Sequence, residues 1–456
     1  MKIKLSQNAF ARTYGPYTYL FNQVSDADFL FRDAGMFFDF VSRDYQESED
    51  IVSQIANVCD VAPSEVRDDF VNLMKPLKNV GIIVDDSKTD YEFSYQNKPQ
   101  ASLLEIYSED EKSETAEFSK TSPKYQLYDY FSEHPTPFSL KVDLTQRCTE
   151  RCLHCYVADY HAPFLPFEKI IEVLTEAREM GTLDVTFTGG ECMMHPQFAE
   201  ILRFAREKDF MVTILSNLTL CDDEKVALLR EIRPRFLQVS LYGSTAEIHD
   251  HITQRSGSFI ETTRAIEKLL AADVPLQFNC PILKENYRDI NNIKKFEKIY
   301  GIKGNYNVAI IGKADGNLVN VSHGLSIDEL KEYYELTGDA LPKGRSDDAC
   351  SDDYVCRTLG HTRINLHSTG NYYPCTSGYN LVLGNCYKQS LREVWEQSEL
   401  LKQLRELRMK DYPKCLACSN LSVCKICPVT FFNETGSLYS QSANTCRLSS
   451  FKAHSM

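Results

Sequence analysis

The chain has 456 residues, and its 64 acidic and 50 basic side chains leave a formal net charge of -14. This acidic balance argues against non-specific binding to nucleic acid or to anionic membranes, which needs an excess of Lys and Arg. No window of the sequence approaches the length of a membrane span. We therefore expect a soluble protein of roughly two to four domains, with no nucleic acid and no membrane among its partners.

Cysteine usage indicates the compartment. The chain has sixteen cysteines, but its first residues, MKIKLSQNAFARTYG, lack the apolar core and cleavage signal of a secretory leader. Disulfide bonds are therefore not expected, and the cytoplasm is the predicted location.

Residues 1–85 carry the pattern of a compact module. Residues 17–31 are predicted to form a hairpin with an Asp turn. Apolar patterns of helical period follow at residues 34–43, 48–61 and 64–86, and the last of them ends in a short strand, Gly81–Val84. Strands, three helices and a closing strand indicate a winged-helix-like domain.

This module resembles the PqqD-like peptide recognition element of enzymes that modify ribosomally made peptides. The resemblance implies that the leader of a precursor peptide binds as an added edge strand. A winged helix that reads DNA is the alternative, and the acidic balance of these residues disfavours it. Residues 86–136, with SEDEKSETAEFSKTSPK at their centre, are polar and predict a partly ordered linker.

Three closely spaced cysteines, Cys148, Cys152 and Cys155, follow an apparent strand in the run DLTQRCTERCLHC. Three thiolates on one loop can hold three irons of a four-iron four-sulfur cluster and leave the fourth iron open. Structural zinc or core packing is the alternative, and zinc would need His154 or a remote residue as its fourth ligand.

The Cys-x3-Cys-x2-Cys spacing, with His154 before the last cysteine, resembles the signature of the radical S-adenosylmethionine (SAM) enzymes. The resemblance implies that Cys148, Cys152 and Cys155 are the catalytic cluster ligands. It also implies that the open iron binds SAM and that an electron from the cluster releases a 5'-deoxyadenosyl radical.

Residues 137–330 alternate between apolar strands and charged amphipathic segments, which indicates parallel βα units. After the strand that precedes the cysteines, strands are expected at residues 184–188, 211–217, 236–243, 275–283 and 305–311. Six units predict an α/β fold with a partial (β/α)6 barrel, whose site lies at the carboxyl ends of the strands.

The family resemblance implies which residues contact SAM. Gly189, Gly190 and Glu191 would receive its amino group, and Ser240 would lie against its ribose. Ser216 and Asn217 end the third strand, and Arg255 is a candidate for the SAM carboxylate. Taken singly, each of the last four is equally a satisfied polar group at a strand end.

Eight of the nine cysteines in residues 331–456 form a second group, too many for a core. This group resembles the SPASM extension, which implies two auxiliary clusters and a total of three 4Fe-4S clusters. The first auxiliary cluster would be held by Cys350, Cys356, Cys375 and Cys427, and the second by Cys415, Cys418, Cys424 and Cys446. Two residues rather than the usual three separate Cys424 from Cys427, and two zinc ribbons are the alternative.

Five further cysteines, Cys59, Cys192, Cys221, Cys280 and Cys386, are expected to be mostly buried thiols. Cys192 follows Glu191 and would face the SAM pocket, so a catalytic role is the alternative there.

The combined resemblance implies an oxidoreductase that forms thioether cross-links, from Cys sulfur to carbon, in a ribosomally made precursor peptide. A flavodoxin or ferredoxin-type protein would supply electrons. The alternatives are carbon–carbon or carbon–oxygen cross-linking, epimerisation, or oxidation of Ser or Cys to formylglycine as in sulfatase maturases.

Overall fold

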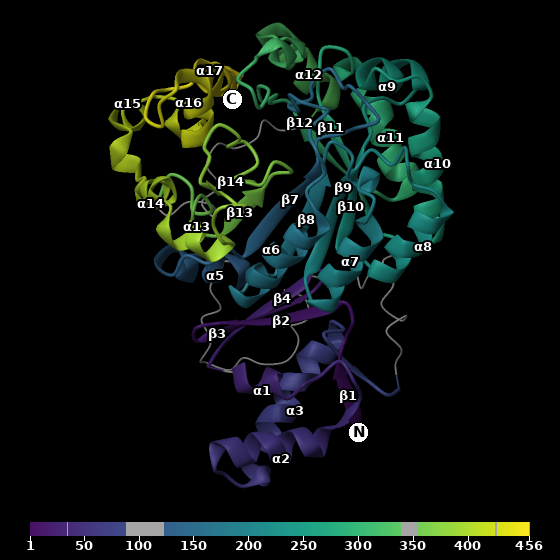
Figure 1. Cartoon of the computed structure of the whole chain (residues 1–456), viewed down its shortest axis with the longest axis vertical. Coiled ribbons are helices and arrows are strands. Elements are labelled where there is room, and N and C mark those ends of the chain that lie inside the picture. Colours follow the sequence, from purple (N-terminus) through teal and green to yellow (C-terminus); the bar gives the residue numbers. More distant parts are fainter. Residues whose placement is uncertain (34, 88–122, 339–353, 425, 456) are drawn as a thin grey trace. The chain divides into compact units, whose positions relative to one another are not determined.

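The computed structural model describes residues 1–33, 35–87, 123–338, 354–424 and 426–455 (Figure 1). The chain divides into two units, Met1–Glu133 and His134–Met456. Within the described ranges no helix is both long and apolar enough to cross a membrane.

The first unit contains two small antiparallel sheets. One has the strand order β5-β1-β6 and the other β2-β3-β4. Their bounds are β1 Lys2–Leu5, β5 Gln46–Glu47, β6 Ile83–Asp85, β2 Ala9–Tyr14, β3 Tyr17–Asn22 and β4 Ala27–Arg32. The expected hairpin is β3 and β4, which pair from Tyr17 opposite Arg32 to Asn22 opposite Ala27. Strand β2 was not predicted, and it makes the hairpin a three-stranded sheet.

Three helices follow these strands, α1 (Gly35–Asp39), α2 (Ser48–Cys59) and α3 (Pro63–Asn79), as the apolar periodicity predicts. Ile51 and Ile55 of α2 and Phe70 and Leu77 of α3 are at most 2% exposed and belong to one core. Strands, helices and a closing strand agree with the expected winged-helix-like order.

The first unit ends later than the sequence suggested. Residues 123–133 form helix α5 (Pro123–Glu133), which contacts β3 and β4. Its Leu127 and Phe131 are fully buried, and the Phe131 ring lies 5.0 Å from that of Tyr14. This helix lies within the stretch expected to be a partly ordered linker, and the sequence did not indicate it because its apolar face comes at the end of a polar stretch. Residues 88–122 lie outside the described residues.

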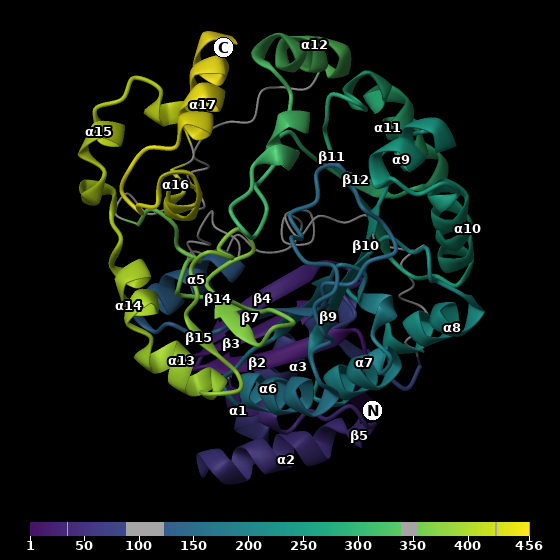
Figure 2. The same cartoon turned by 45° about the horizontal axis from the view of Figure 1, so that its top comes forward.

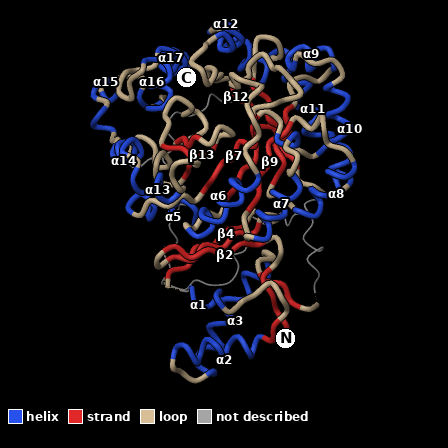
Figure 3. Tube along the Cα trace, in the orientation of Figure 1, coloured by secondary structure: helices blue, strands red, loops and turns tan. Residues whose placement is uncertain are grey.

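The second unit is built on a sheet of the order β12-β11-β10-β9-β8-β7-β13-β14-β15. Its first six strands are parallel and neighbours in chain order, which confirms the α/β fold and the six βα units. Figure 3 shows the strands of this unit in red with blue helices around them. These strands are β7 Ser139–Thr145, β8 Asp184–Gly189, β9 Met211–Ser216, β10 Phe236–Ser240, β11 Leu276–Pro281 and β12 Lys303–Asn307.

Helices cover the outer side of this sheet. Figure 2 shows α6, α7, α8, α10 and α11 in an arc around the strands. The helices of this part are α6 Phe167–Glu179, α7 Phe198–Glu207, α8 Asp223–Ile232, α9 Ala246–Thr253, α10 Ser258–Ala271, α11 Ile290–Tyr300 and α12 Ile327–Thr337. On β7, Leu140, Val142 and Leu144 are fully buried in the core. Because side chains alternate along a strand, Lys141 and Asp143 point to the opposite, inner face.

The carboxyl-terminal part of this unit extends the sheet and then becomes mostly short helices. Strand β13 (Arg363–Leu366) pairs with β7 in parallel, and β14 (Asn371–Tyr373) and β15 (Gly384–Asn385) follow antiparallel. The helices are α13 Leu391–Gln397, α14 Glu399–Glu406, α15 Pro413–Leu416, α16 Pro428–Thr435 and α17 Ala443–Ser455.

Candidate functional site

A cleft of about 360 Å³ opens at the carboxyl ends of the parallel strands. Cys148, Cys152 and Cys155 all line it, from the loop that follows β7. Other residues expected at the site line the same cleft, namely Gly189, Gly190, Ser216, Asn217 and Ser240. The structure therefore brings together groups that lie up to 92 positions apart, from Cys148 to Ser240.

Two glycines let the end of β8 lie directly against the cysteine loop. The amide of Gly190 donates to the carbonyl of Thr145 at 2.7 Å, and the amide of Glu191 donates to the carbonyl of Arg147 at 2.8 Å. Gly189 has a φ of 135°, and a Cβ at either glycine would collide with backbone carbonyl oxygens of this loop. Only glycine fits this close approach, which explains the Gly-Gly pair.

The side chain of Glu191 is fully buried and does not line the cleft. Its carboxylate accepts hydrogen bonds from the Met193 amide at 2.9 Å, the Asn217 amide at 2.8 Å and the Ser216 hydroxyl at 2.9 Å. Burial raises the pKa of this carboxyl group. Glu191 therefore joins the ends of β8 and β9, and any contact of this segment with a ligand falls to the glycines.

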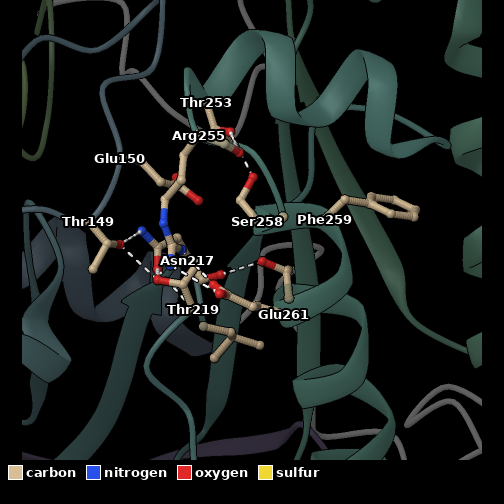
Figure 4. Close-up of polar contacts among 12 residues, drawn as sticks. Thr149, Glu150, Asn217, Thr219, Thr253, Arg255, Ser258, Phe259 and Glu261 are labelled. Carbon is tan, nitrogen blue, oxygen red and sulfur yellow. Dashed lines mark hydrogen bonds and ion pairs between the residues drawn. The ribbon is translucent and has the colours of Figure 1, made fainter.

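Asn217 connects the third strand to the cysteine loop. Its side-chain amide donates to the Thr149 hydroxyl at 3.0 Å and lies 3.6 Å from the Cys148 sulfur. Arg255 lies in the same group of polar side chains (Figure 4) but pairs with Glu261, at 2.6 and 3.1 Å. Arg255 is not among the residues that line the cleft, so in this structure the expected contact with a SAM carboxylate would require that ion pair to rearrange.

Glu150 was not predicted, although it lies between two of the cluster cysteines. It lines the cleft, is 2% exposed, and accepts a hydrogen bond from the Cys152 thiol at 3.4 Å. Burial raises its pKa to about 8. An acidic residue inside the Cys148–Cys152 interval was the available signal.

Burial favours the protonated form of the three thiols on the cysteine loop. Burial raises the pKa of Cys148 to about 12 and raises those of Cys152 and Cys155. A bound cation must therefore displace their protons. Burial lowers the pKa of His154 to about 4, and its ring packs edge-on against Tyr242 at 4.7 Å.

Three cysteine thiols line the cleft, one fewer than a closed zinc site needs. In the described part of the chain no group of three or more His, Cys, Asp or Glu side chains is arranged to hold one metal ion. A closed zinc site brings four ligands within about 2.3 Å of one ion. Three thiols that line one cleft are the number of ligands that a four-iron cluster with one free iron needs.

The carboxyl-terminal cysteines form two groups. The pKa of Cys375 is raised to about 12, mainly by burial and also by the nearby thiols of Cys427 and Cys356. These three cysteines form the first group. The second group lines a smaller cavity of about 80 Å³ and consists of Cys415, Cys418, Cys424 and Cys446. These are the two groups expected from the sequence, apart from Cys350, which lies outside the described residues.

Cys192 faces the core instead of the cleft. It is fully buried, and its thiol donates to the carbonyl of Leu215 at 3.3 Å. This position favours packing over a catalytic role.

Models of two protein families match this chain, one over the parallel strands and one over the carboxyl-terminal cysteines. The model of the radical SAM superfamily matches residues 142–296, and that of SPASM, an iron-sulfur cluster-binding domain, matches residues 356–420. An AdoMet-dependent heme synthase of Methanosarcina barkeri is 26% identical over 326 residues, which cover 64% of this chain and 92% of that protein. The antilisterial bacteriocin subtilosin biosynthesis protein AlbA of Bacillus subtilis is 29% identical over 38% of this chain and 39% of its own length.

Similarity to solved structures extends over nearly the whole chain. The crystal structure of Streptococcus suis SuiB bound to precursor peptide SuiA has a TM-score of 0.65 at 16% identity, and the match covers 98% of this chain and 100% of SuiB. The two proteins therefore share a fold.

Proposed function

We propose that this radical SAM enzyme, which carries a SPASM iron–sulfur domain, is a peptide maturase that links a cysteine sulfur to a carbon atom within a ribosomally made precursor. The observation that carries the proposal is the cleft. There, three thiols, enough to hold all but one iron of a four-iron cluster, line the same cavity as the glycine pair and the polar ends of β9 and β10.

Cys148, Cys152 and Cys155 would hold the cluster at this cleft. A reduced cluster with SAM on its free iron supplies a 5'-deoxyadenosyl radical, which can take hydrogen from an unactivated carbon. The protein contributes binding and orientation. Gly189 and Gly190 offer backbone groups without a side chain, and Ser240 offers a hydroxyl at the end of β10.

Thioether formation removes two hydrogens from the peptide. One leaves the carbon as an atom, and the other leaves the thiol as a proton while one electron departs. The two carboxyl-terminal thiol groups would hold auxiliary iron–sulfur clusters, a cofactor class that can accept an electron. A flavodoxin or ferredoxin-type protein would provide the initial reduction.

Two observations favour a peptide as the substrate. AlbA, a bacteriocin biosynthesis protein, is among the relatives, and the fold shared with peptide-bound SuiB extends over nearly the whole chain. We expect the first unit, with its two small sheets and its helices, to act as a PqqD-like element that binds the leader by adding a strand to a sheet edge.

Heme synthesis is the second candidate, because an AdoMet-dependent heme synthase matches along 92% of its length. A porphyrin substrate gives the first unit no evident task, whereas a leader peptide does.

The test uses the full chain, reconstituted with iron and sulfide without oxygen, then reduced in the presence of SAM. We expect 5'-deoxyadenosine and, from a co-encoded precursor, a product lighter by two hydrogens per cross-link and resistant to thiol alkylation. A leader-free precursor should react much more slowly. Conversion of a porphyrin with no change in any peptide would replace the proposal by the second candidate.

A further inference from the structure

Four side-chain amides line the half of the cleft formed by β10, β11 and β12, and none of them was part of the expected site. They are Gln238, Asn279, Asn305 and Asn307, which we call the amide row. These strands are neighbours in the sheet (Figure 2). Asn279 lies opposite Asn305 in the strand register, and Asn307 is two positions further along β12.

The amide row keeps most of its hydrogen-bonding capacity unused. Asn305 donates to the Asn279 oxygen at 3.3 Å, and the Asn307 oxygen accepts from the Ala309 amide at 2.9 Å. No other side-chain bond of these four residues occurs within the described part of the chain. Each amide can donate two hydrogen bonds and accept two, so the row presents both donors and acceptors to the cleft.

The lysine that lines the cleft from β7 is paired with an acidic side chain. Lys141 lines the cleft, and its ammonium lies 3.4 Å from the Asp143 carboxylate. The Tyr379 hydroxyl accepts from this ammonium at 3.2 Å and donates to the same carboxylate at 3.0 Å. The lining residues that β10, β11 and β12 contribute carry no charged side chain, so this half of the cleft offers neutral donors and acceptors. Such a surface suits a neutral polar ligand better than an ionised side chain.

We propose that the amide row binds the main chain of the precursor's core segment and so holds the reacting residue in the cleft. The inference rests on the proposed function. A peptide group carries one donor and one acceptor, and a side-chain amide can pair with both. Recognition by main chain leaves the side chain free to react and tolerates different neighbours along the peptide.

The test measures binding without turnover, in reconstituted enzyme with SAM but no reductant. The probe is a fluorescein-labelled peptide of Gly and Ala around one Cys, compared with the same peptide N-methylated on both sides of the Cys. Asn279→Leu and Asn305→Leu remove amides at nearly constant volume. Gln277→Leu is the matched control, because Gln277 lies two positions before Asn279 on β11 and does not line the cleft.

We expect each amide variant to weaken binding of the unmethylated probe about tenfold, as lost hydrogen bonds do. The methylated probe should bind wild type correspondingly weakly and should not distinguish the variants. SAM binding and the control should be unchanged.

Three results would overturn the inference: no binding of the unmethylated probe to wild type, variants that bind it as wild type does, or parallel loss of SAM affinity, which would assign the row to SAM. Each can be separated from failure of the proposed function, because cross-linking of the natural precursor by wild-type enzyme is measured independently.

Discussion

The cysteine loop after β7 and the smaller carboxyl-terminal cavity are held in place by different kinds of structure. Cys148, Cys152 and Cys155 lie on a loop joined to the main sheet by backbone hydrogen bonds from the end of β8. Of the four cysteines of the smaller cavity, Cys415 lies on the short helix α15, Cys446 lies on α17, and the other two lie in loops. Cys418 and Cys446 are exposed. The barrel thus preforms the first site, whereas the second depends more on whatever its thiols bind.

The largest expected effect comes from removing a ligand at the first site. Cys152→Ala should abolish 5'-deoxyadenosine formation while leaving the fold intact, because the sheet holds this loop. Product analysis of the reduced enzyme with SAM measures this effect, and circular dichroism checks the fold. Retained SAM cleavage would contradict the assignment of Cys152.

Iron removal should separate the two sites. Without iron, backbone amides around Cys415–Cys446 should exchange hydrogen at least about tenfold faster, while those of β7 to β10 change little. Hydrogen exchange read by mass spectrometry compares both regions in one sample. Equal loss of protection in the barrel strands would remove the distinction between a preformed and a dependent site.

A buried histidine in the barrel predicts that the stability of the protein depends on pH. His249 is fully buried, burial lowers its pKa to about 4, and its ring nitrogen accepts from the Tyr242 amide at 3.2 Å. In the unfolded chain this histidine has a pKa near 6.5. The contribution of its burial to the free energy of unfolding is therefore fully present above that pH and is lost as the pH falls toward 4. The expected loss is about 2–3 kcal/mol.

Urea unfolding of iron-free protein at pH 7 and pH 4.5, followed by fluorescence of Trp395, measures this loss. Trp395 is the single tryptophan and is 4% exposed in the barrel core. His249→Gln should reduce the pH dependence. An unchanged dependence in that variant would assign the acid sensitivity to other groups.

The smallest expected effect comes from Cys192→Ala. Since its thiol packs in the core, the free energy of unfolding should fall by about 1 kcal/mol, with SAM cleavage and cross-linking unaffected. Selective loss of peptide product with normal SAM cleavage would instead indicate a hydrogen donor and favour epimerisation.

Periodicity and spacing predicted the repeating features well. The six parallel strands follow from apolar periodicity. The cysteine loop beside Gly189 and Gly190 and the two carboxyl-terminal thiol groups were implied by the family resemblance. The directions of individual side chains could not be predicted from the sequence, because tertiary packing decides them. Glu191 turns into the core, and Arg255 pairs with Glu261.

Polar residues inside strands were also missed. Asn279 stands between two buried residues of β11, and Asn305 lies on a strand of mostly polar residues, so single-strand reasoning assigns both side chains to solvent. Only the register of the neighbouring strands shows that the two side chains line one cleft.

Mass spectrometry of the precursor after a single turnover with reduced enzyme and SAM tests the central claim most directly. The account predicts one 5'-deoxyadenosine per cross-link, a peptide lighter by two hydrogens, and one cysteine fewer available for alkylation. Formation of 5'-deoxyadenosine with a precursor of unchanged mass and fully alkylated cysteines would contradict it.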